Sequence, residues 1–106
     1  MNARDRDILV KLKNLLQNRV KLHKMILFGS RARMDAEPDS DMDVLVILDE
    51  PRTVKTCDLV FNSAWEAGFD AGVVIVPIVI SRDNWENGHG KSSLLAMAVR
   101  EEGVPV

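Results

Sequence analysis

The sequence predicts a single small α+β domain in which helices pack on a small mixed β-sheet. Three observations support this fold class: the length, the balance of residue types, and an alternation of helical and strand-like hydrophobic patterns. The 106 residues fit one domain, since typical domains have about 100 to 150 residues. Hydrophobic residues make up 46% of the chain and charged residues 28%, and no linker-like stretch divides it. We therefore treat residues 1–106 as one domain.

The chain opens with a helix, a strand and a second, short helix. Apolar residues recur at helical spacing over residues 7–22 and predict an amphipathic helix. The apolar run 25–28 ends at Gly29 and predicts a short buried strand. Ser30 is a favourable N-cap for a helix over residues 31–34. Strand, tight turn and helix are thus expected in direct succession.

A second strand and a long helix follow. Residues 35–40 contain a proline and several polar side chains and predict a loop, after which residues 41–48 predict a strand that opens with two acids. Thr53 can cap a helix that Gly68 is expected to end. The helical spacing places Trp65 on the buried face of that helix.

The last third of the chain predicts a third strand and a final helix. Residues 73–80 are rich in β-branched side chains, but Pro77 lacks a backbone N–H, which favours the edge of the sheet. Residues 81–85 are compatible with a turn or a short helix, and Ser92 or Ser93 can cap the last helix. The predicted order is α-β-α-β-α-β-α with three strands, which indicates an α+β arrangement.

Composition argues against several classes of function. Lys and Arg number 14 against 16 Asp and Glu, so the surface lacks the basic field of proteins that bind extended nucleic acid. The longest apolar run, residues 71–80, is about half the length that crosses a bilayer as a helix, and the N-terminus lacks the apolar stretch of a signal peptide. The single cysteine, Cys57, excludes an internal disulfide. We expect a cytoplasmic protein without a membrane segment.

The glycine turn after the first strand is a candidate phosphate site. A strand that ends in Gly29-Ser30 and leads into a helix exposes backbone N–H groups, which together with the helix dipole favour an anion. Arg31 and Arg33 follow in the first helical turn, where a guanidinium can bind phosphate oxygens. Taken alone, such a turn is more often only a tight connection.

The acids at the start of the second strand are candidate metal ligands. Asp41 and Asp43 are two residues apart, so both carboxylates are expected on one face of the strand, about 6 to 7 Å apart along it. Mg²⁺ prefers oxygen ligands and usually keeps positions open for substrate phosphates. An Asp-x-Asp pair alone is more often a solvated strand end, and it becomes informative only beside the phosphate-binding turn.

The two motifs together point to a known family. The segment LFGSRAR at residues 27–33, followed by SDMDVLV at residues 40–46, resembles the signature of the polymerase-β-type nucleotidyltransferase superfamily, and in particular its minimal, stand-alone prokaryotic members. The resemblance implies a nucleotidyltransferase fold and transfer of a nucleoside monophosphate, expected to be AMP, from a nucleoside triphosphate such as ATP to a hydroxyl of a protein or small molecule. It also implies Mg²⁺ or Mn²⁺ as cofactor.

The resemblance assigns roles and a partner. The turn would hold the triphosphate, and the two acids would hold the metal and act in catalysis. Minimal members commonly pair, as antitoxin, with a small helical toxin of the HEPN type, so we expect such a partner or a second copy of the chain. The site residues predicted in this way are Gly29, Ser30, Arg31, Arg33 and Ser40 for phosphate, and Asp41 and Asp43 for metal.

The sequence departs from the family pattern in one respect that bears on activity. Active members carry a third carboxylate on the next core strand, but residues 73–80 contain no acid, and Asp70 and Asp83 only flank that strand. Without a third acid, the metal loses a ligand and the attacking hydroxyl loses a general base. The alternative function is therefore a weak or inactive binding module that neutralises a partner protein by contact.

Overall fold

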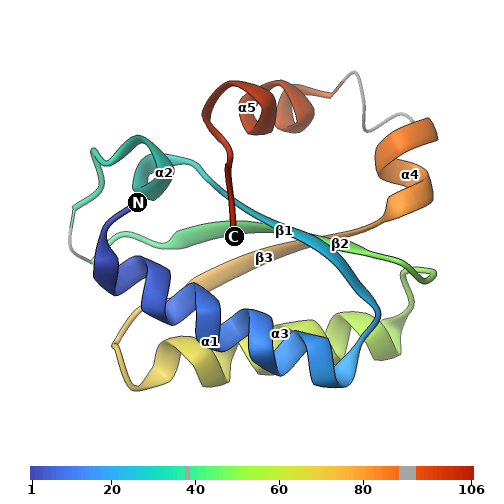
Figure 1. Ribbon diagram of the computed structural model, residues 1–106, viewed down its shortest axis with the longest axis horizontal. Helices are drawn as coiled ribbons and strands as arrows, with labels where there is room; N and C mark the ends of the chain where they lie inside the picture. The colour runs from blue at the N-terminus through green and yellow to red at the C-terminus, as the bar shows by residue number, and fades with distance from the viewer. Residues whose placement is uncertain (38, 89–92) are drawn as a thin grey trace.

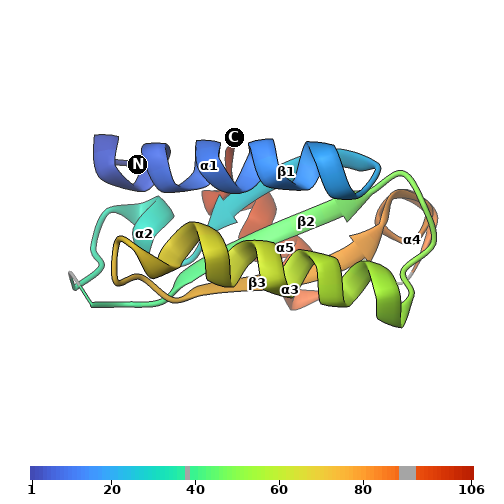
Figure 2. The same cartoon turned by 90° about the horizontal axis from the view of Figure 1, so that it is seen from below.

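The protein is a single β-sheet with helices on both faces. The computed structural model describes residues 1–37, 39–88 and 93–106. Two long helices, α1 (Ala3–Arg19) and α3 (Val54–Phe69), lie side by side under one face (Figures 1 and 2). Three shorter helices lie on the opposite side, with α5 between the other two (Figure 1). These are α2 (Ser30–Arg33), α4 (Arg82–Asn87) and α5 (Leu94–Glu102).

The sheet is mixed, as predicted, and has the strand order β3-β2-β1-β4. The central strands β1 (Leu22–Phe28) and β2 (Met42–Leu48) are antiparallel, whereas β2 and β3 (Ile75–Ser81) are parallel. The predicted α+β fold is therefore confirmed. The short strand β4 (Val104–Pro105), which pairs antiparallel with β1, was not expected because two residues carry no recognisable periodicity.

Two hydrophobic clusters fill the two sides of the sheet. The larger cluster joins α1 and α3 to the side chains of the sheet that face them, among which Met25, Leu27 and Met42 have no exposed surface. The smaller cluster lies under α4 and α5 and contains Leu45 and Ile47 of β2. Since side chains alternate along a strand, Asp43 points to the same side as Leu45 and Ile47. Asp43 therefore lies on the same side of the sheet as the smaller cluster, near the start of β2.

Helix α3 differs from its prediction in two places. Thr53 caps the helix as expected, within a capping box, but the helix continues past Gly68. Gly68 is buried, and a Cβ atom there would clash with the carbonyl oxygen of Val73. Trp65 is 67% exposed and stacks on Phe69 at a centroid distance of 4.7 Å. The prediction of a buried Trp65 is therefore wrong. Smaller side chains instead form the face that packs on the sheet: Cys57, Val60, Ala64 and Ala67.

Strand β3 lies at the edge of the sheet, as Pro77 indicated. The carbonyl of Val74 accepts a hydrogen bond from the N–H of Met42 in β2. Because backbone groups alternate in direction along a strand, the nitrogen of Pro77 points away from β2, where its missing N–H costs no ladder bond. Ser93 caps α5, whereas Ser92 lies outside the described residues. No described helix is long and apolar enough to span a membrane.

Candidate nucleotide site

The site begins at the sharp turn between β1 and α2. Gly29 has φ 76° and ψ −156°, a conformation that is essentially restricted to glycine. Its carbonyl accepts hydrogen bonds from the N–H groups of Ala32 and Arg33, each at 3.1 Å. Gly29 therefore occupies the N-cap position, and Ser30 is the first helical residue, which corrects the prediction that Ser30 is the cap. The first N–H groups of a helix have no acceptor within the helix.

The carboxylate of Asp43 lies directly against this turn. Asp43 is the cross-strand partner of Phe28, the last residue of β1. A Cβ atom added to Gly29 would lie 2.6 Å from Oδ2 of Asp43 and 3.5 Å from its Cγ. The close approach exists only because residue 29 has no side chain. The structure thus brings together two motifs that ten residues, 31–40, separate in the sequence.

The electrostatics of Asp43 favour a bound cation. Partial burial raises the pKa of Asp43 above its ordinary value of 3.8, and the neighbouring carboxylate of Asp41 raises it further. The positive charge of Arg33 acts in the opposite direction and lowers the pKa of Asp43. Two carboxylates that destabilise each other's charge are relieved by a shared divalent cation. Asp41 itself is exposed and open to solvent.

Arg33 lies near the acids and is held by two further carboxylates. Its Nη1 donates to Oε2 of Glu102 at 2.7 Å, and its Nε donates to Oδ2 of Asp35 at 3.1 Å. The side chain remains 46% exposed, so a phosphate group has access to it. Glu102, at the end of α5, was not predicted, because 69 residues separate it from Arg33 in the chain.

Arg31 does not reach the phosphate-binding side of the turn. Its side chain is 5% exposed, and its Nη1 forms an ion pair at 2.9 Å with Asp5 of α1. Its Nε and Nη2 both donate to the backbone carbonyl of Ser40, at 3.0 and 2.6 Å. Arg31 therefore has a structural position, in contrast to the predicted phosphate contact. Ser40 contributes its carbonyl to this contact and lies directly before Asp41.

Comparison with known proteins supports the resemblance. A family model described as polymerase beta, nucleotidyltransferase matches residues 10–74, which include the turn and both acids. The chain belongs to this nucleotidyltransferase family.

One relative of this chain is a Methanocaldococcus jannaschii protein that bears the name of a candidate protein adenylyltransferase, MJ0141. The two are 36% identical over 62 residues, which cover 58% of this chain and 63% of the relative. The match thus spans less than two thirds of the relative's length.

Solved structures with the same fold include antitoxins. A toxin-antitoxin complex with AMP-PNP gives a TM-score of 0.64 at 18% identity and covers 91% of this chain and 69% of that one. A mutant of the toxin-antitoxin pair MntA-HpeT gives 0.65 at 16% identity, with the same coverage. The tri-AMPylated Shewanella oneidensis HEPN toxin in complex with MNT antitoxin gives 0.58 at 17% identity, over 92% of this chain and 67% of that one. These likenesses establish the fold.

No acid of β3 lies beside Asp43. The parallel register pairs Asp43 with Val76, so a valine stands where a third carboxylate would face the pair. Asp70 forms an ion pair with Lys11 of α1 in the helix layer on the other side of the sheet. Asp83 accepts from Asn87 within α4, beyond the opposite end of β3. Among the residues that the structure describes, no group of three or more His, Cys, Asp or Glu side chains could hold a metal.

Two carboxylates nonetheless fit one magnesium ion. Mg²⁺ is commonly bound by one or two carboxylates together with waters and substrate phosphates, rather than by a cage of protein ligands. Asp41 and Asp43 offer hard oxygen donors beside a turn whose N–H groups favour an anion. The donor set therefore suits a metal that arrives with a polyphosphate.

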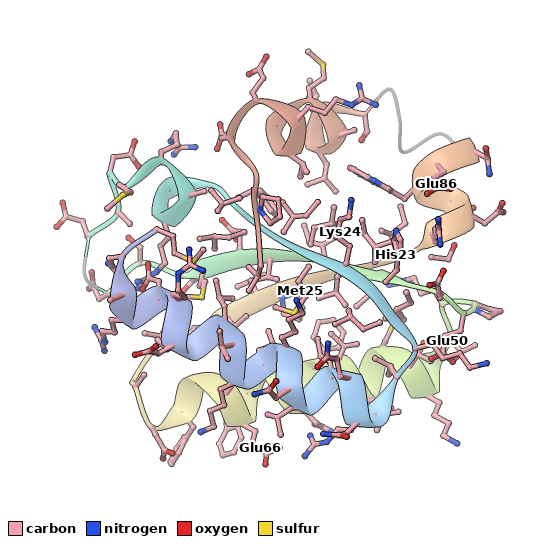
Figure 3. The ribbon with its side chains drawn as sticks, viewed as in Figure 1. His23, Lys24, Met25, Glu50, Glu66 and Glu86 are labelled. Atoms are coloured by element: carbon pink, nitrogen blue, oxygen red, sulfur yellow. The ribbon has the colours of Figure 1, made fainter. Side chains whose placement is uncertain are left out.

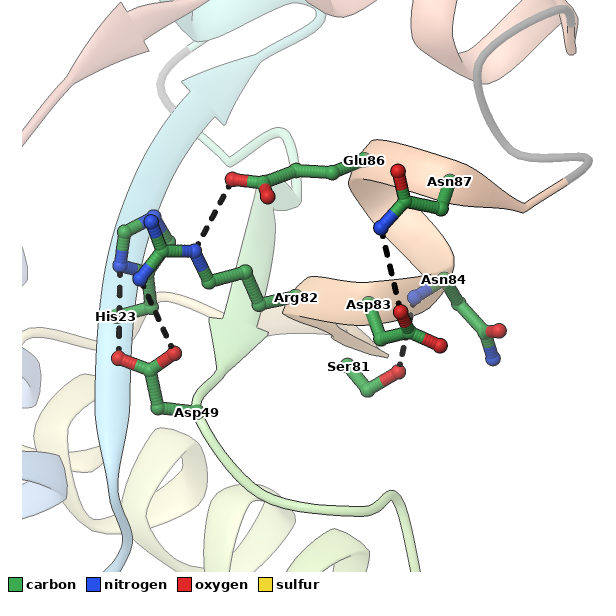
Figure 4. A network of polar contacts seen from close by, with 8 residues as sticks. All are labelled: His23, Asp49, Ser81, Arg82, Asp83, Asn84, Glu86 and Asn87. Carbon is green, nitrogen blue, oxygen red and sulfur yellow. Dashed lines mark hydrogen bonds and ion pairs between the residues drawn. The ribbon is translucent and has the colours of Figure 1, made fainter.

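A second polar cluster lies at the opposite end of the sheet, where β2 and β3 end. Asp49 lies 3.6 Å from His23 and 3.4 Å from Arg82, and Arg82 also binds Glu86 at 3.0 Å (Figure 4). Asp49, Arg82 and Glu86 border a cavity of about 500 Å³. His23, Glu50 and Glu86 all lie at the end of the molecule away from α2 (Figure 3). This cluster is therefore separate from the turn and its acids.

Proposed function

We propose that this nucleotidyltransferase moves AMP from ATP to a hydroxyl group of a protein or small-molecule acceptor, and that it acts as the antitoxin of a HEPN-type toxin in the cytoplasm. The observation that carries the proposal is the contact between the Asp43 carboxylate and the Gly29 turn. A triphosphate bound at the turn would touch a cation held by the acids. The names of the relatives, which mention adenylyl transfer, AMP-PNP and an AMPylated toxin, support the choice of AMP.

Each residue of the site has a defined part in this proposal. The backbone N–H groups at Gly29 and Ser30 would hold phosphate oxygens, and Arg33 would neutralise part of their charge. Asp41 and Asp43 would hold Mg²⁺ or Mn²⁺, which when bound offsets the charge of the triphosphate. The acceptor oxygen bonds to the α-phosphorus, the bond from that phosphorus to the bridging oxygen breaks, and pyrophosphate leaves with the electron pair. The hydroxyl proton is released.

Transfer of label tests the proposal directly. The chain is incubated with Mg²⁺, ATP labelled at the α-phosphate, and a HEPN-type protein purified from the same source. We expect label on the HEPN protein, and loss of the label with Asp41→Asn and Asp43→Asn together. Asp58→Asn, which changes an exposed acid on the far helix layer, is the matched control and should leave labelling unchanged. A HEPN protein that stays unlabelled would contradict the transfer.

The second candidate function is neutralisation of the partner by contact alone. Val76 favours it, because an apolar side chain occupies the place beside Asp43 where a third acid would assist the hydroxyl. Under this alternative a stable complex forms without label.

One substitution separates a weak enzyme from a contact module. Val76→Asp introduces a carboxylate at the cross-strand partner of Asp43, at a position that is 37% exposed. If the missing acid limits transfer, Val76→Asp should increase labelling by about a hundred-fold, the lower end of the range for a positioned general base. Ile78→Asp, equally exposed and one side-chain repeat further from the site, is the control. No gain with Val76→Asp would show that the absent acid is not what limits the rate.

A further inference from the structure

A buried ion pair joins the N-terminal helix to the site. Asp5 of α1 and Arg31 of α2 are 3% and 5% exposed, and Oδ1 of Asp5 accepts from Nη1 of Arg31 at 2.9 Å. A buried pair of charges is costly to desolvate and is retained only where its geometry is well satisfied.

The guanidinium of Arg31 connects the two motifs of the site. The backbone of Arg31 belongs to the first turn of α2, directly after Gly29 and Ser30. Its Nε and Nη2 donate to the carbonyl of Ser40, the residue before Asp41. The fork thus links the phosphate-binding turn to the start of the acidic strand, and Asp5 fixes the third side of the guanidinium. We use the name clamp for Asp5, Arg31 and the Ser40 carbonyl.

We propose that Asp5 is a positioning residue for nucleotide and metal binding, an inference that rests on the proposed function. By holding Arg31, Asp5 sets the distance between the turn and the carboxylates of Asp41 and Asp43. The geometry leaves little tolerance, because Asp43 already lies at contact distance from Gly29. Metal and phosphate ligands must be held to within about 0.5 Å of their productive positions, so a loosened clamp would separate the two halves of the site.

Calorimetric titration with Mn²⁺·AMP-PNP tests the clamp. Asp5→Asn keeps the size of the side chain and removes its charge, and we expect roughly ten- to hundred-fold weaker binding, as for other residues that orient metal ligands. Arg31→Lys keeps the charge but cannot make the two bonds to Ser40, and should weaken binding to a similar extent. Circular dichroism selects a temperature at which every variant is folded.

Two controls separate positioning from stability. Asp7→Asn changes an exposed acid on the same helix and should bind as the wild type does. Leu16→Ala removes a fully buried side chain at the far end of α1, so it lowers the melting temperature without touching the clamp. It should also bind as the wild type does. A purely structural role for Asp5 would make Asp5→Asn behave like Leu16→Ala.

The outcomes for the clamp and for the proposed function are distinct. If the wild type binds and both clamp variants bind equally well while folded, the inference is wrong and the nucleotide site stands. If the wild type does not bind Mn²⁺·AMP-PNP, both the proposed function and the inference about the clamp are wrong. If binding weakens in Asp5→Asn and Arg31→Lys but not in Leu16→Ala, Asp5 positions the site.

Discussion

Substitution of Gly29 by alanine tests the contact on which the site is built. A side chain at residue 29 would have to accept φ 76° and ψ −156°, which costs about 1 to 3 kcal/mol for a residue other than glycine. The new methyl would also lie 2.6 Å from Oδ2 of Asp43, so one of the two must move. Overpacking of this kind typically costs about 1 to 3 kcal/mol. We expect Gly29→Ala to lower the free energy of unfolding by the sum of the two, about 2 to 6 kcal/mol.

Urea unfolding followed by circular dichroism measures this change against a matched glycine. Gly72 also has a positive φ, 67°, but a Cβ atom there would meet nothing within 4 Å. Gly72→Ala therefore carries backbone strain alone and should cost about 1 to 2 kcal/mol. The excess cost of Gly29→Ala over Gly72→Ala combines the steric conflict at the turn with the difference in backbone strain between the two positions.

A double substitution identifies the group responsible for the excess. In an Asp43→Ala background the carboxylate is absent, so Gly29→Ala should cost about 1 to 3 kcal/mol, the backbone part alone. The reasoning is refuted if Gly29→Ala costs no more than Gly72→Ala. It is equally refuted if removal of the Asp43 carboxylate leaves the cost of Gly29→Ala unchanged.

Three further predictions concern stability. Burial and Asp41 raise the pKa of Asp43, so ionisation of Asp43 destabilises the fold as the pH rises from 3.8 through the folded pKa. Without metal, Asp43→Asn should therefore be more stable than the wild type at pH 7. Thermal unfolding should show this difference shrinking in acid. Val60→Ala, at a fully buried position, should cost about 2 to 3 kcal/mol in urea unfolding. Trp65→Ser removes a mostly exposed ring that stacks on Phe69 and should cost only about 1 kcal/mol or less. Thr53→Ala removes the capping box and should cost about 1 kcal/mol in the same assay.

The parts of the structure that depend on local pattern could be predicted from the sequence. The helices, the three main strands and the edge position of β3 follow from hydrophobic spacing and from Pro77. Asp41, Asp43 and the Gly29 turn could be predicted as a candidate site because each belongs to a short, recognisable sequence motif. Trp65 could not be placed correctly, because a wide apolar stripe on a helix does not show which of its edges packs on the sheet.

The parts that depend on long-range contacts could not be predicted. Asp5 meets Arg31 across 26 residues of chain, and Asp5 looks in the sequence like any other acid of a charged helix start. Because this contact is long-range, the burial of Arg31 could not be predicted either. The sequence alone suggests that Arg31, like Arg33, binds phosphate. Only the fold shows that Arg31 is buried in the clamp while Arg33 stays exposed to solvent.

Calorimetric titration of the wild type and of the Asp41→Asn/Asp43→Asn variant with Mg²⁺·AMP-PNP tests the central claim most directly. The turn and the two carboxylates are proposed to bind one metal-triphosphate together, so the wild type should bind in the presence of Mg²⁺ and the variant should not. The variant should remain folded, since Asp41 is exposed and Asp43 is partly exposed, and asparagine has nearly the same size as aspartate. Equal affinity of the two proteins for Mg²⁺·AMP-PNP would contradict the assignment of the site.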